Sequence, residues 1–217
     1  MHRTPADVIC GMRIFVGVRV EFIFWVVSKM AFKDKFKEFQ ALDINDDIIL
    51  RQAEPDNDCH AFYEIFCDID AFCYYSGVHG TNHSIEKSWK ILSNQIKEFE
   101  KASIYSWIIS DKKSRKALGR ILLSSFEGNN KKANIGYFLG RNSWGKGIIS
   151  DCIKPVVEFG FSHLELERIY TTVHVDNVGS WKALEKNGFL REGLLRHSFN
   201  VNNCLFDCYM YSRLNTD

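Results

Sequence analysis

Apolar and polar residues alternate over successive stretches in the first half of the chain, and this alternation predicts strands. Strands are expected at residues 48–51, 103–110, 117–126 and 133–139, the last two joined by a Gly-Asn-Asn turn. Helix-spaced apolar residues occur at 61–69 and 84–101, and Ser84 is a good N-cap for the second helix. The last three strands form a predicted meander.

After residue 139 the pattern changes to strands that alternate with helices. Helices are expected at about 148–163 and 177–187, and strands at 168–175, 189–197 and 205–213. Gly188 is a natural stop for the second of these helices. This unit, added to a meander, predicts an α+β fold with a mixed, mostly antiparallel central sheet and helices on both faces.

Residues 1–30 do not fit this pattern. The stretch from Val8 to Val27 is strongly apolar, but Arg13, Arg19 and Glu21 interrupt it and would be costly within a bilayer. Three interpretations stay open: translation from upstream of a functional start at Met30 or Met12, an extra element packed on the domain, or a membrane-associating anchor. We expect an atypical extension over residues 1–40, which need not belong to the native domain, and a single domain over 41–217.

Composition narrows the functional classes. The 28 Lys and Arg nearly balance the 27 Asp and Glu, so the net charge of +1 favours neither nucleic acid nor anionic lipid as a partner. The seven cysteines form no C-x-x-C motif and no zinc-finger spacing, so we expect no metal site. Thiols in a reducing cytoplasm are the simplest interpretation.

A glycine pair, Gly145 and Gly147, follows the strand at 133–139 and precedes a helix. Glycines let the backbone approach a ligand, and the free amides of a helix start attract an anion. The pair therefore predicts a phosphate or pyrophosphate cradle. The spacing is neither that of a P-loop nor that of a dinucleotide fingerprint, and a plain turn is the alternative.

A second run, from Val175 to Phe189, links a strand end to a helix. Asn177 could cap that helix, or its amide could bind a ligand between two splayed strands. Ser180 would face the same opening from the first helical turn, and a neutral surface hydroxyl is the alternative for it.

Together the two runs resemble the GCN5-related N-acetyltransferase (GNAT) superfamily, within it the ribosomal-protein N-terminal (Rim-type) branch, from about Ile48 to Leu214. The segments that carry the resemblance are Leu50-Arg51, Ile135-Gly-Tyr-Phe-Leu139, Gly145-Lys-Gly147, Asp151, Phe159-Gly-Phe161, Glu167-Arg-Ile169, Asn177-Val-Gly-Ser180, Glu185-Lys-Asn-Gly-Phe189, Glu192-Gly193, Leu195-Arg196 and Asp207. The resemblance implies splayed fourth and fifth strands, here 133–139 and 168–175. It also implies acetyl transfer from acetyl-CoA to a primary amine by direct attack in a ternary complex.

The resemblance further implies a set of donor-binding residues. Asn177 would hydrogen-bond the pantetheine arm, and Lys182 or Lys186 would meet the adenosine 3′-phosphate. Backbone groups would pair with the pantetheine at Tyr137, Phe138 and Leu139, and amides would hold the pyrophosphate at Trp144, Gly145, Lys146, Gly147, Ile148 and Ile149.

For catalysis the resemblance implies an oxyanion donor and an acid. The N–H near Phe138 is the expected oxyanion donor. Ser180 is the expected acid for the departing sulfur, because Leu184 stands where many relatives carry a tyrosine. The base stays open between His174, whose intrinsic pKa suits the role, and a water chain. Asn134 stands where relatives often carry a glutamate, while Glu192 and Asp207 match family positions but could merely brace the late hairpin.

Two alternatives to an enzyme stay open: a non-catalytic module of the same fold, and a membrane-associated protein that acts through residues 8–27. The acceptor would be a peptide N-terminus or a small amine, bound by the loop 74–82, the start of the helix at 84–101 and the hairpin near 197–203. That loop is not strongly acidic, which disfavours polyamines. A cytoplasmic monomer or homodimer is expected.

Overall fold

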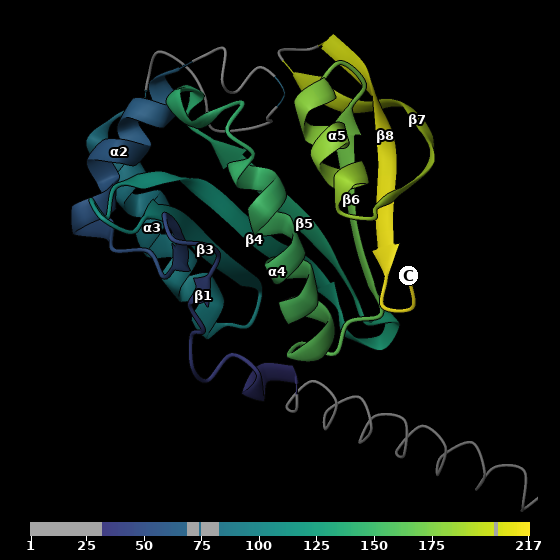
Figure 1. Ribbon diagram of the computed structural model, residues 1–217, viewed down its shortest axis with the longest axis horizontal. Coiled ribbons are helices and arrows are strands. Elements are labelled where there is room, and N and C mark those ends of the chain that lie inside the picture. The colour runs from purple at the N-terminus through teal and green to yellow at the C-terminus, as the bar shows by residue number, and fades with distance from the viewer. Residues whose placement is uncertain (1–31, 69–73, 75–82, 202–203) are drawn as a thin grey trace, which may run out of the picture.

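A single sheet forms the centre of the computed structural model, which describes residues 32–68, 74, 83–201 and 204–217 (Figure 1). It has eight strands in the order β1-β2-β3-β4-β5-β6-β8-β7. Only the β5–β6 pair is parallel among these neighbours. The strands are β1 (Leu42–Asp43), β2 (Ile48–Arg51), β3 (Ile104–Asp111), β4 (Ala117–Glu127), β5 (Lys132–Leu139), β6 (Arg168–His174), β7 (Leu190–Val201) and β8 (Cys204–Leu214). This confirms the predicted mixed, mostly antiparallel sheet.

Helices cover both faces of the sheet, also as predicted. They are α2 (Pro55–Cys67), α3 (Ile85–Glu100), α4 (Ile148–Ser162) and α5 (Val178–Lys186), with short 3-10 turns at Gly128–Asn130 and Arg141–Ser143. Alternation along β5 divides the faces: Ile135 and Leu139 are buried in one cluster with α4, and Phe138 in another with α2.

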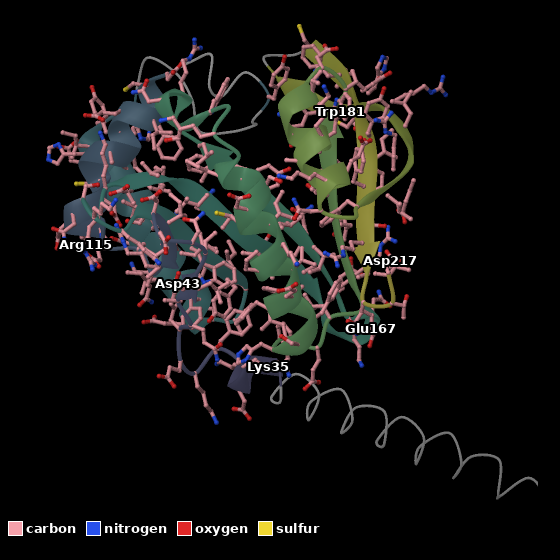
Figure 2. All side chains as sticks on the ribbon, viewed as in Figure 1. Lys35, Asp43, Arg115, Glu167, Trp181 and Asp217 are labelled. Carbon is pink, nitrogen blue, oxygen red and sulfur yellow. The ribbon has the colours of Figure 1, made fainter. Side chains whose placement is uncertain are left out.

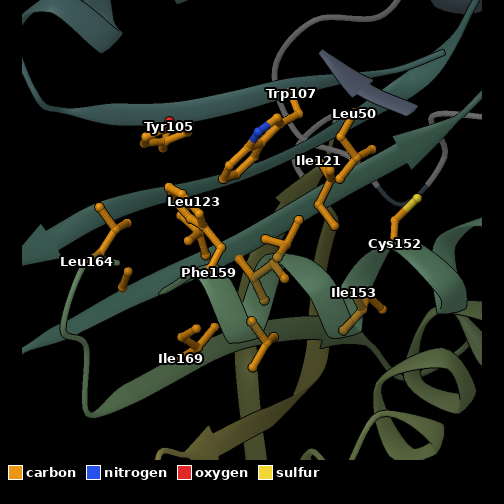
Figure 3. Packing of buried hydrophobic residues seen from close by; sticks show 14 of the residues in the cluster. Leu50, Tyr105, Trp107, Ile121, Leu123, Cys152, Ile153, Phe159, Leu164 and Ile169 are labelled. Carbon is orange, nitrogen blue, oxygen red and sulfur yellow. The ribbon is translucent and has the colours of Figure 1, made fainter. Parts of the chain in front are cut away.

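The larger core cluster lies between α4 and the sheet. Figure 3 shows strand residues such as Trp107 and Leu123 opposite Phe159 and Ile153 of α4. The helix packs closely here because residue 160 is glycine: a Cβ at Gly160 would lie 2.7 Å from Cδ1 of Ile169. Close packing fixes the position of α4, and with it the loop that precedes the helix.

The parallel pair β5–β6 is joined along only part of its length. Lys132, Ala133 and Asn134 pair with Arg168, Ile169 and Tyr170, and the two strands, both fully described, form no pairs beyond these residues. Each strand continues for four or five residues past the last pair. The strands therefore splay apart toward their carboxyl ends, which confirms the splay that the resemblance implied.

One helix begins earlier than its sequence pattern predicts. The pattern of apolar residues starts near residue 61, whereas α2 begins at Pro55. Its first turn carries Asp58, which is buried because both its carboxylate oxygens accept from Arg51, at 2.9 and 2.6 Å. Asp58 occupies a buried helix position where an apolar residue would be expected. The hydrophobic pattern therefore does not extend to the first turn of α2. Strand β7 likewise runs past residue 197, because it pairs with β8 as far as Val201.

Residues 32–40, the described part of the predicted extension, pack against the domain. Phe36 is only 4% exposed and lies among Phe99, Tyr105 and Phe126. Lys35 lies beside the end of α4 (Figure 2), where its Nζ donates to the His163 carbonyl at 3.0 Å. Residues 1–30, for which three interpretations were left open, lie outside the described residues. Among the described helices, none has the length and apolar character needed to span a bilayer.

Candidate functional site

Backbone groups of β5 line one side of the opening between β5 and β6. The Gly140 N–H donates to Leu118 of β4 at 2.9 Å, and hydrogen-bonded pairs alternate along an antiparallel ladder. The groups of Phe138 therefore face β4, and its carbonyl oxygen lies 2.2 Å from where a Cβ on Gly119 would stand. The groups of Tyr137 and Leu139 face the opening. This corrects the expectation that the Phe138 amide donates there.

The loop after β5 ends in the start of α4, and two of its glycines, Gly145 and Gly147, adopt backbone conformations that favour glycine. Gly145 and Gly147 have φ angles of 73° and 78°, a region that other residues enter only with strain. A Cβ at either position would meet no atom within 4 Å, so the space above the loop is open. The first helical bond runs from the Asp151 N–H to the Gly147 carbonyl.

Most amides of this loop point to no protein acceptor. In the described part of the chain, the N–H groups of residues 145–149 make no hydrogen bond to a protein group. Trp144 differs, because its N–H donates to Arg141 at 3.0 Å and its indole donates to the Leu139 carbonyl at 2.9 Å. The Trp144 amide and the Leu139 carbonyl are therefore already hydrogen-bonded within the protein, which corrects the prediction that they bind the ligand. The remaining amides, at the positive end of the α4 dipole, form a candidate anion cradle.

The start of α5 lies across the opening from β5. Asn177 is its N-cap, and the side-chain oxygen accepts the Ser180 N–H at 3.2 Å. This confirms the capping interpretation of Asn177. The cap uses only the oxygen, so the amide nitrogen of the same side chain is not needed to hold the helix. Lys182, one turn further, is exposed, with its Nζ 5.8 Å from the centre of the Trp181 ring.

The Tyr137 side chain bridges the two sides of the opening. Its phenol oxygen lies 2.9 Å from the Ser180 hydroxyl and 3.3 Å from the Ser180 carbonyl. Burial raises the phenol pKa above its usual value, and the hydrogen bond to Ser180 only partly opposes this. Sequence reasoning used only the backbone of Tyr137. The alternation of side chains along a strand places the Tyr137 side chain on the same face as Ile135 and Leu139. This alternation was the only sequence signal that the side chain faces α4.

His174 lies at the end of β6 and is 7% exposed. Its Nδ1 accepts the Asp176 N–H at 3.1 Å, so the neutral ring carries its proton on Nε2. The rings of Tyr74 and Phe206 lie 4.9 Å away, centre to centre. Because the one lone pair of the neutral ring is already used, this arrangement argues against the predicted role of His174 as the base.

The two carboxylates that match family positions brace the late hairpin. Glu192 accepts from Arg168 at 2.7 Å and from Ser212 at 2.6 Å, and the hydrogen bond from Arg168 is the main reason that its pKa falls to about 2. Asp207 accepts the His197 N–H at 2.9 Å. The lowered pKa makes Glu192 a weak base. No cluster of metal-binding side chains occurs in the described parts of the chain. Of the predicted acceptor elements, residues 75–82 of the loop and residues 202–203 of the hairpin lie outside the described residues.

Comparisons with known proteins agree on one family. The family model for the acetyltransferase (GNAT) domain matches residues 47–190. The chain is 31% identical over 167 residues to YoaA, an uncharacterized N-acetyltransferase of Bacillus subtilis, covering 77% of this chain and 93% of YoaA. It is 38% identical over 103 residues to the uncharacterized N-acetyltransferase p20 of Bacillus licheniformis, covering 48% of this chain but only 58% of p20.

A third relative is the ribosomal-protein-serine acetyltransferase of Escherichia coli, 32% identical over 102 residues, which cover 47% of this chain and 57% of that protein. Among solved structures, the fold is similar to the microcin C7 self-immunity acetyltransferase MccE in complex with acetyl-CoA and AMP. The TM-score is 0.71 at 25% identity, covering 79% of this chain and 94% of MccE. The family model runs from the start of β2 to the start of β7, so it includes the splayed strands, the glycine loop and the α5 cap. The chain therefore belongs to the GNAT acetyltransferase family.

Proposed function

We propose that the chain is an acetyl-CoA-dependent N-acetyltransferase that acts on a primary amine by direct attack in a ternary complex. The observation that carries the proposal is the opening between β5 and β6, which ends at a helix start whose amides have no protein acceptor among the described residues. Such an opening suits a long, amide-bearing ligand with a pyrophosphate at one end. GNAT acetyltransferases use acetyl-CoA, and the similar MccE was solved with it.

The residues that would hold the donor follow from the geometry. The backbone groups of Tyr137 and the Leu139 N–H face the opening and suit the pantetheine amides, as does the amide nitrogen of Asn177. The N–H groups of Gly145, Lys146, Gly147, Ile148 and Ile149 suit the pyrophosphate. Lys182 and Lys186, exposed on α5, suit the 3′-phosphate.

Acetyl-CoA supplies an acetyl thioester whose carbonyl is already electrophilic, so the chain does not need to activate it strongly. A neutral amine attacks the thioester carbonyl, forming a C–N bond, and the C–S bond then breaks. The N–H of Tyr137 or Leu139, which faces the opening, stabilises the negative charge that develops on the carbonyl oxygen of the thioester. Ser180 gives a proton to the departing sulfur and regains one from water, while the amine proton leaves through a water chain.

A peptide N-terminus is the acceptor that the relatives favour, and a small amine is the alternative. The Escherichia coli relative is named for ribosomal-protein serine acetylation, which supports the peptide. The cytoplasm is the proposed location, supported by the free thiols of Cys59, Cys67, Cys152, Cys204 and Cys208. Both a monomer and a homodimer are compatible with the proposed site.

Calorimetry with acetyl-CoA, together with thiol release against a panel of peptides and small amines, tests the proposal. The wild-type chain should bind acetyl-CoA and release thiol with at least one amine. Ser180→Ala should slow a single turnover about 100-fold and leave acetyl-CoA affinity nearly unchanged, because an acid acts only as sulfur leaves. Ser162→Ala, at the exposed end of α4, is the matched control.

Two results would count against the proposal. Lack of acetyl-CoA binding up to millimolar concentration would exclude it. Binding without thiol release to any amine would favour the non-catalytic module of the same fold.

A further inference from the structure

The contact between Tyr137 and Ser180 joins two elements that are otherwise separated by the splay. Tyr137 is in β5 and Ser180 is in the first turn of α5, 43 residues later. The two oxygens are 2.9 Å apart, a normal distance for a hydrogen bond between hydroxyls. The contact therefore lies across the opening that we assign to the acyl donor.

We propose that Tyr137 is a positioning residue, which orients and polarises the Ser180 hydroxyl toward the departing sulfur. The inference rests on the proposed function, in which Ser180 is the acid. It adds a side-chain role to a residue whose backbone alone was assigned to the site.

Two side chains, those of Asn177 and Tyr137, hold Ser180, and they contact different atoms of it. The Asn177 side chain accepts the Ser180 N–H and so fixes the backbone of the first turn. The Tyr137 phenol contacts the Ser180 side-chain oxygen. Since Asn177 already caps the helix start, the phenol is not needed to cap it, and the shorter of the two phenol contacts, at 2.9 Å, is to the hydroxyl.

Burial keeps the phenol in the protonated form. The Tyr137 side chain packs against the core cluster under α4 and α5, and its pKa is raised by this burial. A neutral phenol has one proton to donate and two acceptors within reach, the side-chain oxygen and the carbonyl oxygen of Ser180. The phenol can therefore donate to the serine oxygen while keeping its own proton.

A hydrogen bond from the phenol makes the serine a better donor. An aliphatic hydroxyl alone is a weak acid, but hydrogen bonds in a chain polarise one another. When the phenol donates to the serine oxygen, the serine proton is directed away from β5, and the negative charge left on that oxygen is partly offset. The proton that sulfur receives comes from Ser180, and Tyr137 loses none.

A double-mutant cycle on the single-turnover rate tests the inference, with acetyl-CoA as donor and the fastest amine of the panel as acceptor. Tyr137→Phe keeps the ring and removes only the hydroxyl. It should slow the turnover about tenfold, with acetyl-CoA affinity within about twofold of wild type. The double variant Tyr137→Phe, Ser180→Ala should be no slower than Ser180→Ala alone, because the phenol acts only through the serine.

The pH profile tests whether the phenol stays neutral while it acts. Because the raised pKa keeps the phenol neutral, the loss caused by Tyr137→Phe should stay constant from about pH 6 to about pH 9. Tyr170→Phe, on the neighbouring strand β6, is the matched control and should behave as wild type. Unfolding curves of all variants would verify that each chain is folded at the assay temperature.

Three results would overturn the inference: a wild-type rate in Tyr137→Phe, losses that multiply in the double variant, or a loss confined to acetyl-CoA affinity. Multiplied losses would mean that Tyr137 acts independently of Ser180, and an affinity loss would mean a merely structural contact. A wild-type chain that turns over no amine would instead overturn the proposed function, and this inference with it.

Discussion

At the scale of single residues, the proposed function gives the Asn177 side chain two roles, holding a helix and contacting the donor. Its oxygen accepts from Ser180 and caps α5. A carboxamide has two further N–H donors on its nitrogen, which the cap does not use. Structural and functional roles thus belong to different atoms, and substitutions can separate them.

Asn177→Asp should retain the cap but lose the donor. Aspartate caps helices about as well as asparagine, so the free energy of unfolding should change by less than about 0.5 kcal/mol. Acetyl-CoA affinity should fall at least about tenfold, because a donor becomes an acceptor with negative charge. Asn177→Ala should lose affinity and also about 1 kcal/mol of stability. Calorimetry and urea unfolding measure the two effects; wild-type affinity in the aspartate variant would restrict Asn177 to capping.

Sequence reasoning was reliable for residues whose role depends on local geometry. The Asn177 cap and the helix start that follows Gly145 and Gly147 depend on a few neighbouring residues, and both are confirmed. The Phe138 amide was misassigned because its direction depends on the register between β5 and β4, which the sequence does not display. The Tyr137 phenol was missed for a similar reason, since its partner is distant in sequence.

At the scale of elements, the start of α4 and the end of α5 are joined through one side chain. Asn187 follows α5 directly, and its amide nitrogen donates to the Ser150 carbonyl at 3.0 Å and to the Ala183 carbonyl at 2.8 Å. Ser150 belongs to the first turn of α4. The tie therefore fixes the anion cradle of α4 relative to α5, which carries Asn177 and Ser180.

Asn187→Ala should loosen this tie. Lost hydrogen bonds at a half-buried position should cost about 1–2 kcal/mol of unfolding free energy. Acetyl-CoA affinity should fall about three- to tenfold, since the cradle amides would no longer be held in one arrangement. Asn130→Ala, in the exposed hairpin turn, is the control and should change neither quantity. Unchanged affinity in Asn187→Ala would show that core packing alone positions α4.

Most elements could be predicted because their hydrophobic periods are regular. Helix α3 begins after Ser84 as expected, and β5 and β6 lie within one residue of their predicted bounds. The failure at α2 has a definite cause, the buried pair of Arg51 and Asp58, whose charges break the apolar period. The end of β7 beyond residue 197 was not predicted, because this part of the strand is held by pairing with β8 rather than by burial.

At the scale of the whole molecule, the boundary of the domain is decided by packing that no local pattern reveals. Residues 32–40 were predicted to be part of an extension, yet they contribute to the core and to its hydrogen bonds. The Gln40 N–H donates to the Tyr105 hydroxyl at 2.8 Å, and the Trp107 indole donates to the Gln40 carbonyl at 2.8 Å. Burial raises the Tyr105 pKa to about 12, and the hydrogen bond from the Gln40 N–H only partly opposes this.

Two truncations should therefore behave differently. A chain that starts at Met30 keeps Phe36 and Gln40 and should unfold at the urea concentration of the full chain. A chain that starts at Ala41 uncovers Tyr105 and Trp107 and should lose several kcal/mol, of the order expected for removing a buried phenylalanine. Phe36→Ala in the full chain should lose about 3 kcal/mol, whereas Lys37→Ala, at an exposed position, should lose almost nothing. Equal stability of the two truncated chains would place the start of the domain at residue 41 and make the packing of Phe36 incidental. A loss on removal of residues 1–29 alone would instead favour an extra element packed on the domain.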